Sequence, residues 1–300
     1  MPDRTMTGLY PILAMPFDEG GRIDVEDLQR EVEFAVSHGA HGVGIAMASE
    51  IYKLSEAERD LVTATVVEQV RGRVKAVVNT GAQGTDLAVQ YSRRAEELGA
   101  DAVMVSPPSV GAVTGDELRG YFRSISDAVD VPIFMQDQPA AQVAPALAAQ
   151  IARESENACY AKVETPPTAP RVAQAVEAGG GALIVFGGAG GIVLIEELRR
   201  GAVGTMPHCV VPELFRRAWD LYQEGAEVEA QREFDRFAPL LRTISQGGGP
   251  SSIGVVKELL RLRGVFKAAH VRQPATPLDA LAAREVRGVF ETLGLSRYSA

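Results

Sequence analysis

The sequence predicts a (β/α)8 barrel, or TIM barrel, an α/β fold, with a C-terminal helical extension. Short apolar runs alternate with amphipathic stretches along most of the 300 residues, and eight such strand-helix units follow one another. Several runs are almost continuously apolar, as expected for parallel strands that are covered on both faces. A doubly wound open sheet usually carries a GxGxxG turn after its first strand, and no such spacing follows the first strand here.

The eight expected strands occupy residues 9–15, 42–46, 74–79, 102–106, 132–136, 158–162, 183–187 and 202–206. The helices between and after them are expected at residues 25–37, 56–70, 86–98, 116–127, 144–153, 169–177, 192–199 and 212–224. Each of several expected helices begins with a capping residue and has acidic residues in its first turn. Ser55, for example, precedes Glu56 and Glu58. Further helices are expected at 226–244, 253–262 and 278–293, with a loop at Gly247-Gly248-Gly249-Pro250. We therefore expect a barrel over residues 1–224 and a helical extension over residues 225–300.

Composition excludes several classes of partner. The net charge is -9, and Lys and Arg are scattered, which argues against nucleic acid and against an anionic membrane surface. The two cysteines, Cys159 and Cys209, form neither a disulfide framework nor a CxxC metal pattern, which is typical of a reducing cytoplasm. No apolar run reaches membrane-spanning length, and the first residues lack the plan of a secretion signal.

Lys162 is the most informative residue, because it stands in an apolar strand. The run Cys159-Tyr160-Ala161-Lys162-Val163 is followed by Glu164 and a Thr-Pro-Pro loop. Burying an ammonium group is costly unless it is paired or loses its proton, and a neutral, desolvated amine attacks carbonyl carbons well. The residue therefore indicates imine (Schiff-base) chemistry at the C-terminal end of a barrel strand, where reactive groups stand. Alternatively, it lies at a strand edge and its head reaches solvent.

Glu164 is expected on the same strand face as Lys162, because side chains alternate between faces. A carboxylate there could move protons, hold a substrate hydroxyl, or only pair with the lysine. Tyr160 lies on this face too, one layer deeper, and is expected to fill the barrel.

The order of several motifs resembles the dihydrodipicolinate synthase / N-acetylneuraminate lyase family. They are Met15-Pro16-Phe17-Asp18, Asn79-Thr80-Gly81-Ala82, Pro107-Pro108, Lys162 on the sixth strand and Gly201-Ala202-Val203-Gly204. The resemblance implies a barrel with a helical extension, an imine between Lys162 and pyruvate or another 2-oxo acid, no cofactor and no metal. It also implies a homodimer or homotetramer.

Departures from the family pattern concern the groups around the lysine. The Gly-Thr-Thr-Gly-Glu run of the family is replaced by Ala46-Met47-Ala48-Ser49-Glu50, so that Ala48, Ser49 and Glu50 are the substrate-binding candidates. The family's Tyr-Asn-x-Pro is replaced by Gln136-Asp137-Gln138-Pro139, and a glutamine amide orients a substrate but does not shuttle protons. Either proton transfer has moved to Glu164 and Asp137, or the site binds a carbonyl ligand without turnover. We favour the first, because these two carboxylates suffice for acid/base work.

Two loops complete the expected site. Gly187-Gly188-Ala189-Gly190-Gly191 follows the seventh strand, and Gly187 and Gly188 either bind an anion through backbone N–H groups or give the substrate room. Met206 and His208 end the eighth strand and are expected at the substrate; His208 beside Cys209 is a weak metal pattern. The sequence thus predicts a cytoplasmic imine-forming lyase, by aldol cleavage or condensation or by dehydration of a 2-keto-3-deoxy sugar acid. The alternatives are a non-catalytic carbonyl-binding barrel and, more weakly, a phosphate-sugar barrel enzyme.

Overall fold

The structure, a computed structural model, describes residues 1–246 and 252–299. The loop expected at Gly247–Pro250 lies outside these residues. The chain divides into two units, one made of Met1–Tyr10 and Lys75–Pro207 and the other of Pro11–Val74 and His208–Ala300. Each is described by itself below as the first and the second unit.

The first unit contains seven parallel strands in the order β1-β8-β7-β6-β5-β4-β3. Their bounds are β1 Gly8–Leu9, β3 Lys75–Asn79, β4 Ala102–Val105, β5 Ile133–Asp137, β6 Tyr160–Val163, β7 Ile184–Gly187 and β8 Gly204–Thr205. Almost every strand residue is buried, which agrees with strands that are covered on both faces. Neighbouring strands pair without a slip where the site is built, with Gln136 beside Lys162 and Lys162 beside Phe186.

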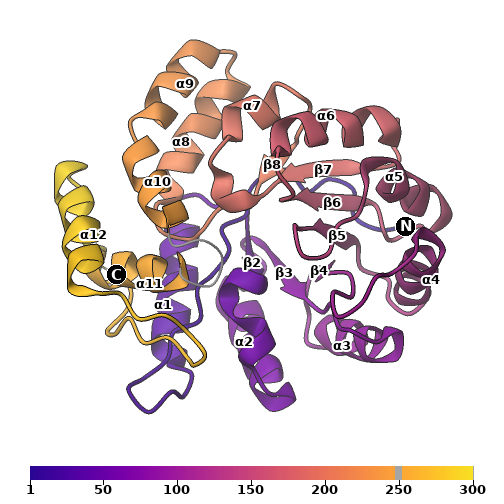
Figure 1. Cartoon of the computed structure of the whole chain (residues 1–300), viewed down its shortest axis with the longest axis horizontal. Coiled ribbons are helices and arrows are strands. Elements are labelled where there is room, and N and C mark those ends of the chain that lie inside the picture. The colour runs from indigo at the N-terminus through magenta and orange to yellow at the C-terminus, as the bar shows by residue number, and fades with distance from the viewer. Residues whose placement is uncertain (247–251, 300) are drawn as a thin grey trace. The chain divides into compact units, whose positions relative to one another are not determined.

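Each strand from β3 to β7 is followed by a helix that lies outside the strands (Figure 1). These helices are α3 Thr85–Glu97, α4 Gly115–Ser126, α5 Pro145–Glu154, α6 Thr168–Gly179 and α7 Leu194–Leu198, the last preceded by the 3-10 turn η3 Ala189–Gly191. The start of α4 shows how local sequence sets these bounds. Thr114 accepts a hydrogen bond from the Glu117 backbone, and the Glu117 side chain accepts one from the Thr114 backbone.

An aromatic layer fills the first unit below the strand ends. The rings of Phe134 and Tyr160 are stacked with centroids 4.5 Å apart, and Phe186 meets Phe134 edge-on at 5.3 Å and Tyr10 at 5.4 Å. The Tyr160 hydroxyl donates to the Asp3 carbonyl and accepts from the Met6 N–H, so that its polar end is satisfied. Lys162 follows Tyr160 by two residues on β6, so its side chain lies next to this aromatic layer on the same face of the strand.

The second unit contains one strand of the sheet and seven longer helices in its described part. Their bounds are α1 Val25–Ser37, β2 Gly42–Ile45, α2 Glu56–Val70, α8 Pro212–Gln223, α9 Glu227–Asp235, α10 Ala238–Gln246, α11 Ser252–Leu262 and α12 Ala280–Thr292, with 3-10 turns η1 Met47–Ser49 and η2 Ile51–Lys53. The segment that continues from β1 pairs with β2, because Leu13 N–H donates to the Gly44 carbonyl and Gly44 N–H to the Pro11 carbonyl.

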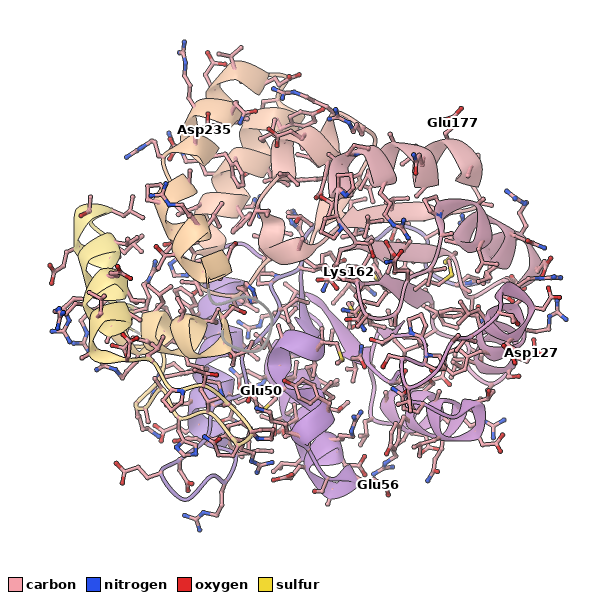
Figure 2. All side chains as sticks on the ribbon, in the orientation of Figure 1. Glu50, Glu56, Asp127, Lys162, Glu177 and Asp235 are labelled. Carbon is pink, nitrogen blue, oxygen red and sulfur yellow. The ribbon has the colours of Figure 1, made fainter. Side chains whose placement is uncertain are left out.

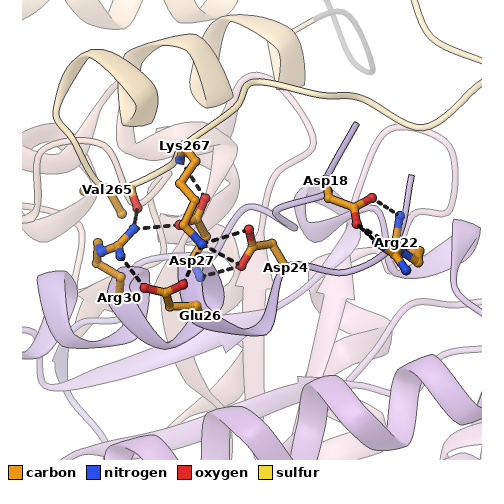
Figure 3. A network of polar contacts seen from close by, with 8 residues as sticks. All are labelled: Asp18, Arg22, Asp24, Glu26, Asp27, Arg30, Val265 and Lys267. Carbon is orange, nitrogen blue, oxygen red and sulfur yellow. Dashed lines mark hydrogen bonds and ion pairs between the residues drawn. The ribbon is translucent and has the colours of Figure 1, made fainter. Parts of the chain in front are cut away.

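A network of charges fixes the segment after α11 to the N-terminus of α1 (Figure 3). Asp24 caps the helix by accepting the Asp27 N–H, and the Lys267 ammonium lies 2.7 Å from Glu26 and 3.2 Å from Asp24. The Lys267 N–H donates to Asp27, which also pairs with Arg30 at 2.6 Å. The C-terminal segment is therefore part of the folded second unit and not a loose tail.

The eight strands and their helices have the order of a (β/α)8 barrel, which confirms the predicted fold class. The expected helix over 226–244 is two helices, α9 and α10. Pro239 explains this break, because proline lacks an N–H and is accepted only in the first turn of a helix. No helix in the described part of the chain is both long and apolar enough to span a membrane.

Candidate active site

Lys162 stands at the C-terminal end of β6, with its side chain 3% exposed. Figure 2 shows it among the strands, whereas Asp127 and Glu177 of the same unit lie at the surface. Its Nζ atom is 3.1 Å from Oε1 of Glu164. The structure thus brings together the lysine and the carboxylate that strand alternation predicts on one face.

Glu164 is held from three sides. Lys162 faces Oε1, the Gln136 side-chain N–H donates to Oε2 at 2.6 Å, and the Ala189 N–H reaches Oε1 at 3.4 Å. Burial by itself raises the pKa of this carboxyl, but the Lys162 ammonium and the Gln136 hydrogen bond outweigh burial and hold the pKa below its usual range. Glu164 is therefore a carboxylate at neutral pH.

Gln136 connects this pair to two further polar side chains on neighbouring strands. Its Oε1 accepts the Ser106 hydroxyl at 2.6 Å and the Asn79 amide at 3.0 Å, and the same Asn79 nitrogen donates to Ser106 Oγ at 3.1 Å. Asn79 is the last residue of β3, and Ser106 directly follows β4. The side chains of Asn79, Ser106 and Gln136 are all buried. We call Asn79, Ser106, Gln136, Glu164 and Lys162 the polar chain.

Asp137 lies on the other face of β5, because it is adjacent to Gln136. Its carboxylate forms a two-pronged ion pair with Arg171, at 2.5 Å and 2.8 Å, and accepts the Thr165 hydroxyl and the Val143 N–H. The structure does not bring this predicted catalytic residue to Lys162. Its contacts are those of a carboxylate that holds the loop after β6 and helix α6 against the sheet.

The glycines at the end of β7 face two different carboxyl groups. A Cβ atom at Gly188 would lie 2.4 Å from Cγ of Glu164, and a Cβ atom at Gly187 would lie 1.8 Å from Oε2 of Glu197. Gly188 requires glycine, because a Cβ atom there would also meet the Val163 carbonyl at 3.0 Å, whereas a Cβ atom at Gly187 would displace the carboxyl end of Glu197. One loop amide already meets Glu164, so the loop offers a poorer anion site than its sequence suggests.

Glu197 of α7 is a buried carboxyl group that the sequence analysis did not single out. It is 1% exposed, and among the described residues neither of its oxygens has a hydrogen bond of standard geometry. Burial raises the pKa of Glu197 to about 8, although the neighbouring Thr168 hydroxyl lowers it in part. The group is therefore a neutral acid near pH 7.

In the second unit, Ser49 and Ala48 differ in what they can offer a ligand. The Ser49 hydroxyl donates to the Leu13 carbonyl at 2.5 Å and accepts the Ala46 N–H at 3.0 Å, and the residue is fully buried. Its side chain thus serves the loop itself. Ala48 is partly exposed, which leaves the loop backbone as the accessible part.

Glu50 is also buried and paired inside the second unit. It adopts a left-handed backbone conformation with φ 53°, and its carboxylate contacts Lys53 at 2.8 Å and Lys257 of α11. Burial lowers the pKa of Lys257 to about 8, although Glu50 raises it in part. Glu50 and Lys257 therefore join the loop after β2 to the C-terminal helices.

The remaining predicted residues, Met206 and His208, follow β8 in the sequence. Met206 is buried and its N–H donates to the Gly187 carbonyl at 3.0 Å. His208, in the second unit, is partly exposed and its backbone bridges Ile12. Within residues 1–246 and 252–299, no group of three His, Cys, Asp or Glu side chains could hold a metal ion.

The Dihydrodipicolinate synthetase family model matches residues 5–292. The chain belongs to this family. L-2-keto-3-deoxyarabonate dehydratase of Azospirillum brasilense is 33% identical over 279 residues, which cover 90% of this chain and 89% of that protein. 4-hydroxy-tetrahydrodipicolinate synthase of Pelobacter propionicus is 26% identical over 96% of this chain and 99% of that protein. The crystal structure of dihydrodipicolinate synthase from Rhodopseudomonas palustris has a TM-score of 0.87 and 28% identity, and covers 95% of this chain and 97% of that chain.

Family membership confirms the resemblance read from the sequence and the barrel fold. The protein is a lyase of the aldolase and dehydratase type, as the names of the family and of these relatives indicate.

Proposed function

We propose that the protein forms an imine between Lys162 and a pyruvate-type 2-oxo acid, with Glu164 as the proton carrier. The observation that supports this most strongly is the buried amine 3.1 Å from a carboxylate at the C-terminal end of β6. A surface ion pair would offer neither the water-poor surroundings nor the fixed geometry that proton transfer needs.

The reaction begins with transfer of a proton from Lys162 to Glu164. The neutral amine attacks the C2 keto carbon, and the resulting carbinolamine loses its hydroxyl as water when Glu164 returns the proton. The protonated imine then withdraws electrons from C3, and Glu164 removes a C3 proton to give the enamine. These steps need one proton carrier close to both the amine and C3, which is the place of Glu164.

The substrate class we propose is a 2-keto-3-deoxy sugar acid, which loses water. The C4 hydroxyl of the enamine leaves with the proton that Glu164 took from C3, and hydrolysis of the unsaturated imine frees Lys162. The relative from Azospirillum brasilense is named for such a dehydration and shares 33% identity over 90% of this chain. Aldol cleavage breaks the C3–C4 bond instead and needs a base at the C4 hydroxyl.

Borohydride trapping tests the imine. The protein is incubated with pyruvate, 2-oxobutyrate or L-2-keto-3-deoxyarabonate and sodium borohydride, and digested for peptide mass mapping. We expect a reduced adduct on Lys162 and none on Lys257, a second buried lysine, whose pKa is lowered to about 8 by burial. The Lys162→Arg variant should give no adduct. No adduct in folded wild-type protein, or an adduct on Lys257, would support the carbonyl-binding alternative or a different nucleophile.

Product analysis then separates dehydration from aldol cleavage. Lactate dehydrogenase coupled to the reaction detects pyruvate, which only the cleavage releases from a 2-keto-3-deoxy sugar acid. We expect loss of water without pyruvate. The Glu164→Gln variant should still form the imine slowly but lose exchange of the pyruvate methyl protons with solvent, and unchanged exchange would exclude Glu164 as the carrier.

A further inference from the structure

The polar chain has a direction. Asn79 and Ser106 both donate to Gln136 Oε1, and the amide nitrogen of Gln136 donates to Glu164. If the Gln136 amide alone were turned over, its nitrogen would face the Asn79 nitrogen and its oxygen would face a carboxylate. Both of those contacts are repulsive, so the donors at Asn79 and Ser106 fix the orientation of the amide.

The same direction favours the carboxylate form of Glu164. The Gln136 N–H donates to Oε2 of Glu164, and a hydrogen bond to a charged carboxylate is stronger than one to the carbonyl oxygen of a neutral acid. A Gln136 amide whose orientation is fixed by Asn79 and Ser106 therefore stabilises the charged form of Glu164.

We propose that Ser106 and Asn79 are positioning residues that act through Gln136 to hold Glu164 as a carboxylate beside Lys162. This inference rests on the proposed function, because it assigns a task to residues around its proton carrier. Among the described residues, both side chains donate to Gln136 and neither forms a hydrogen bond to Glu164, and both are almost fully buried, Ser106 at 7% and Asn79 at 2% exposed. Their influence on the reaction is thus transmitted by the Gln136 amide.

Apart from the Ala189 N–H, two titratable groups on two elements act on Glu164. Lys162 of β6 lies at 3.1 Å, and Glu197 of α7 acts on it electrostatically from beyond Gly187. Neither group contacts Ser106 or Asn79, so changes at these two residues should leave both in place. A shift in the titration of Glu164 can then be attributed to the amide.

The test compares Ser106→Ala and Asn79→Ala with the control Ser92→Ala. Ser92 is equally buried and bonds Thr80 at 2.8 Å, but it has no contact with Gln136. Carbon NMR of the Glu164 side-chain carboxyl, assigned by its loss in Glu164→Gln, measures the titration without any substrate. We expect the midpoint to rise by about one pH unit in the first two variants, a tenfold change worth about 1.4 kcal/mol. The control should not move, and Ser106→Thr, which keeps the hydroxyl, should restore the wild-type midpoint.

Kinetics give the second measurement. The acidic limb of kcat/KM should move upward by the same amount, with KM at the optimum unchanged. An unmoved midpoint in both alanine variants would overturn the positioning role, and so would a raised KM with an unmoved pH profile, which indicates contact with substrate. Failure of the proposed function looks different, because then wild-type protein gives no adduct on Lys162 while the NMR result still stands.

Discussion

Replacing Glu197 by glutamine should make the protein more stable at neutral pH. The side chain is 1% exposed and its oxygens lack hydrogen bonds of standard geometry within the described residues. Such a carboxyl group is tolerated only in its neutral form, which glutamine imitates in size and in polarity. The Glu197→Gln change therefore removes a titration and keeps the shape of the group against Gly187.

The magnitude follows from the difference between the folded and unfolded pKa. The unfolded glutamate titrates near 4.5, and burial raises the pKa of Glu197 to about 8 in the folded protein. Between these values the unfolded chain releases a proton that the folded chain keeps. Stability therefore falls with rising pH by about 1.4 kcal/mol per unit, which reaches about 3 kcal/mol near pH 7. This loss of stability is absent below the pKa of the unfolded glutamate, and it stops growing above the pKa of Glu197 in the folded protein.

Urea unfolding at a series of pH values between 4 and 9 measures this difference. The two proteins should be about equally stable near pH 4, and the variant should gain about 3 kcal/mol near pH 7, with a melting temperature about 6 °C higher. The control Glu196→Gln makes the same change at the next residue, which is partly exposed, and should stay within about 0.5 kcal/mol. Parallel stability curves for wild type and Glu197→Gln would show that Glu197 ionises normally in the folded protein and would refute the reasoning.

Three further predictions concern single side chains. Gly188→Ala places a methyl group against Glu164 and should slow turnover at least about tenfold. The control Gly120→Ala, in open space on α4, should leave turnover unchanged and raise the free energy of unfolding by up to about 1 kcal/mol. Asp137→Asn breaks a buried ion pair and should lower the unfolding free energy by about 3 kcal/mol in urea, with borohydride trapping retained; lost trapping at unchanged stability would favour a catalytic role instead. Lys257→Met leaves its buried carboxylate partner with one cation and should also lower stability by about 3 kcal/mol, and an unchanged urea midpoint would contradict this.

The alternation of strands and helices could be predicted, because it depends on local features of the sequence, namely apolar runs and capping residues. The residues at which the elements begin and end could not be predicted in this way. A strand was expected over residues 9–15, but β1 spans Gly8–Leu9, since Pro11 offers no N–H to continue the pairing. Pro239 likewise marks a helix start inside a stretch whose apolar spacing suggests one continuous helix. In both cases the missing N–H of one proline sets the end of the element. The apolar periodicity of the sequence does not reveal this.

The site could be predicted in part. Lys162 and Glu164 share a face by strand alternation alone, and the structure places them together. The same alternation predicts that only one of Gln136 and Asp137 can face the lysine, but the register of β5 against β6 decides which, and register depends on pairing across the sheet. Ser106 gave no signal, because its role depends on a partner on another strand. The catalytic assignments of Glu164 and Asp137 stay predictions.

At the end of β7, a single stretch of backbone without side chains separates two carboxyl groups. Gly188 lets Glu164 lie against one face of the chain, and Gly187 lets Glu197 lie against the other. The negative charge of Glu164 adds to the burial that raises the pKa of Glu197. A proton that binds Glu164 therefore lowers the pKa of Glu197, and a fixed negative charge on α7 would raise the pKa of Glu164 without contacting any ligand. The two glycines thereby make helix α7 an electrostatic control point for a group that it never contacts.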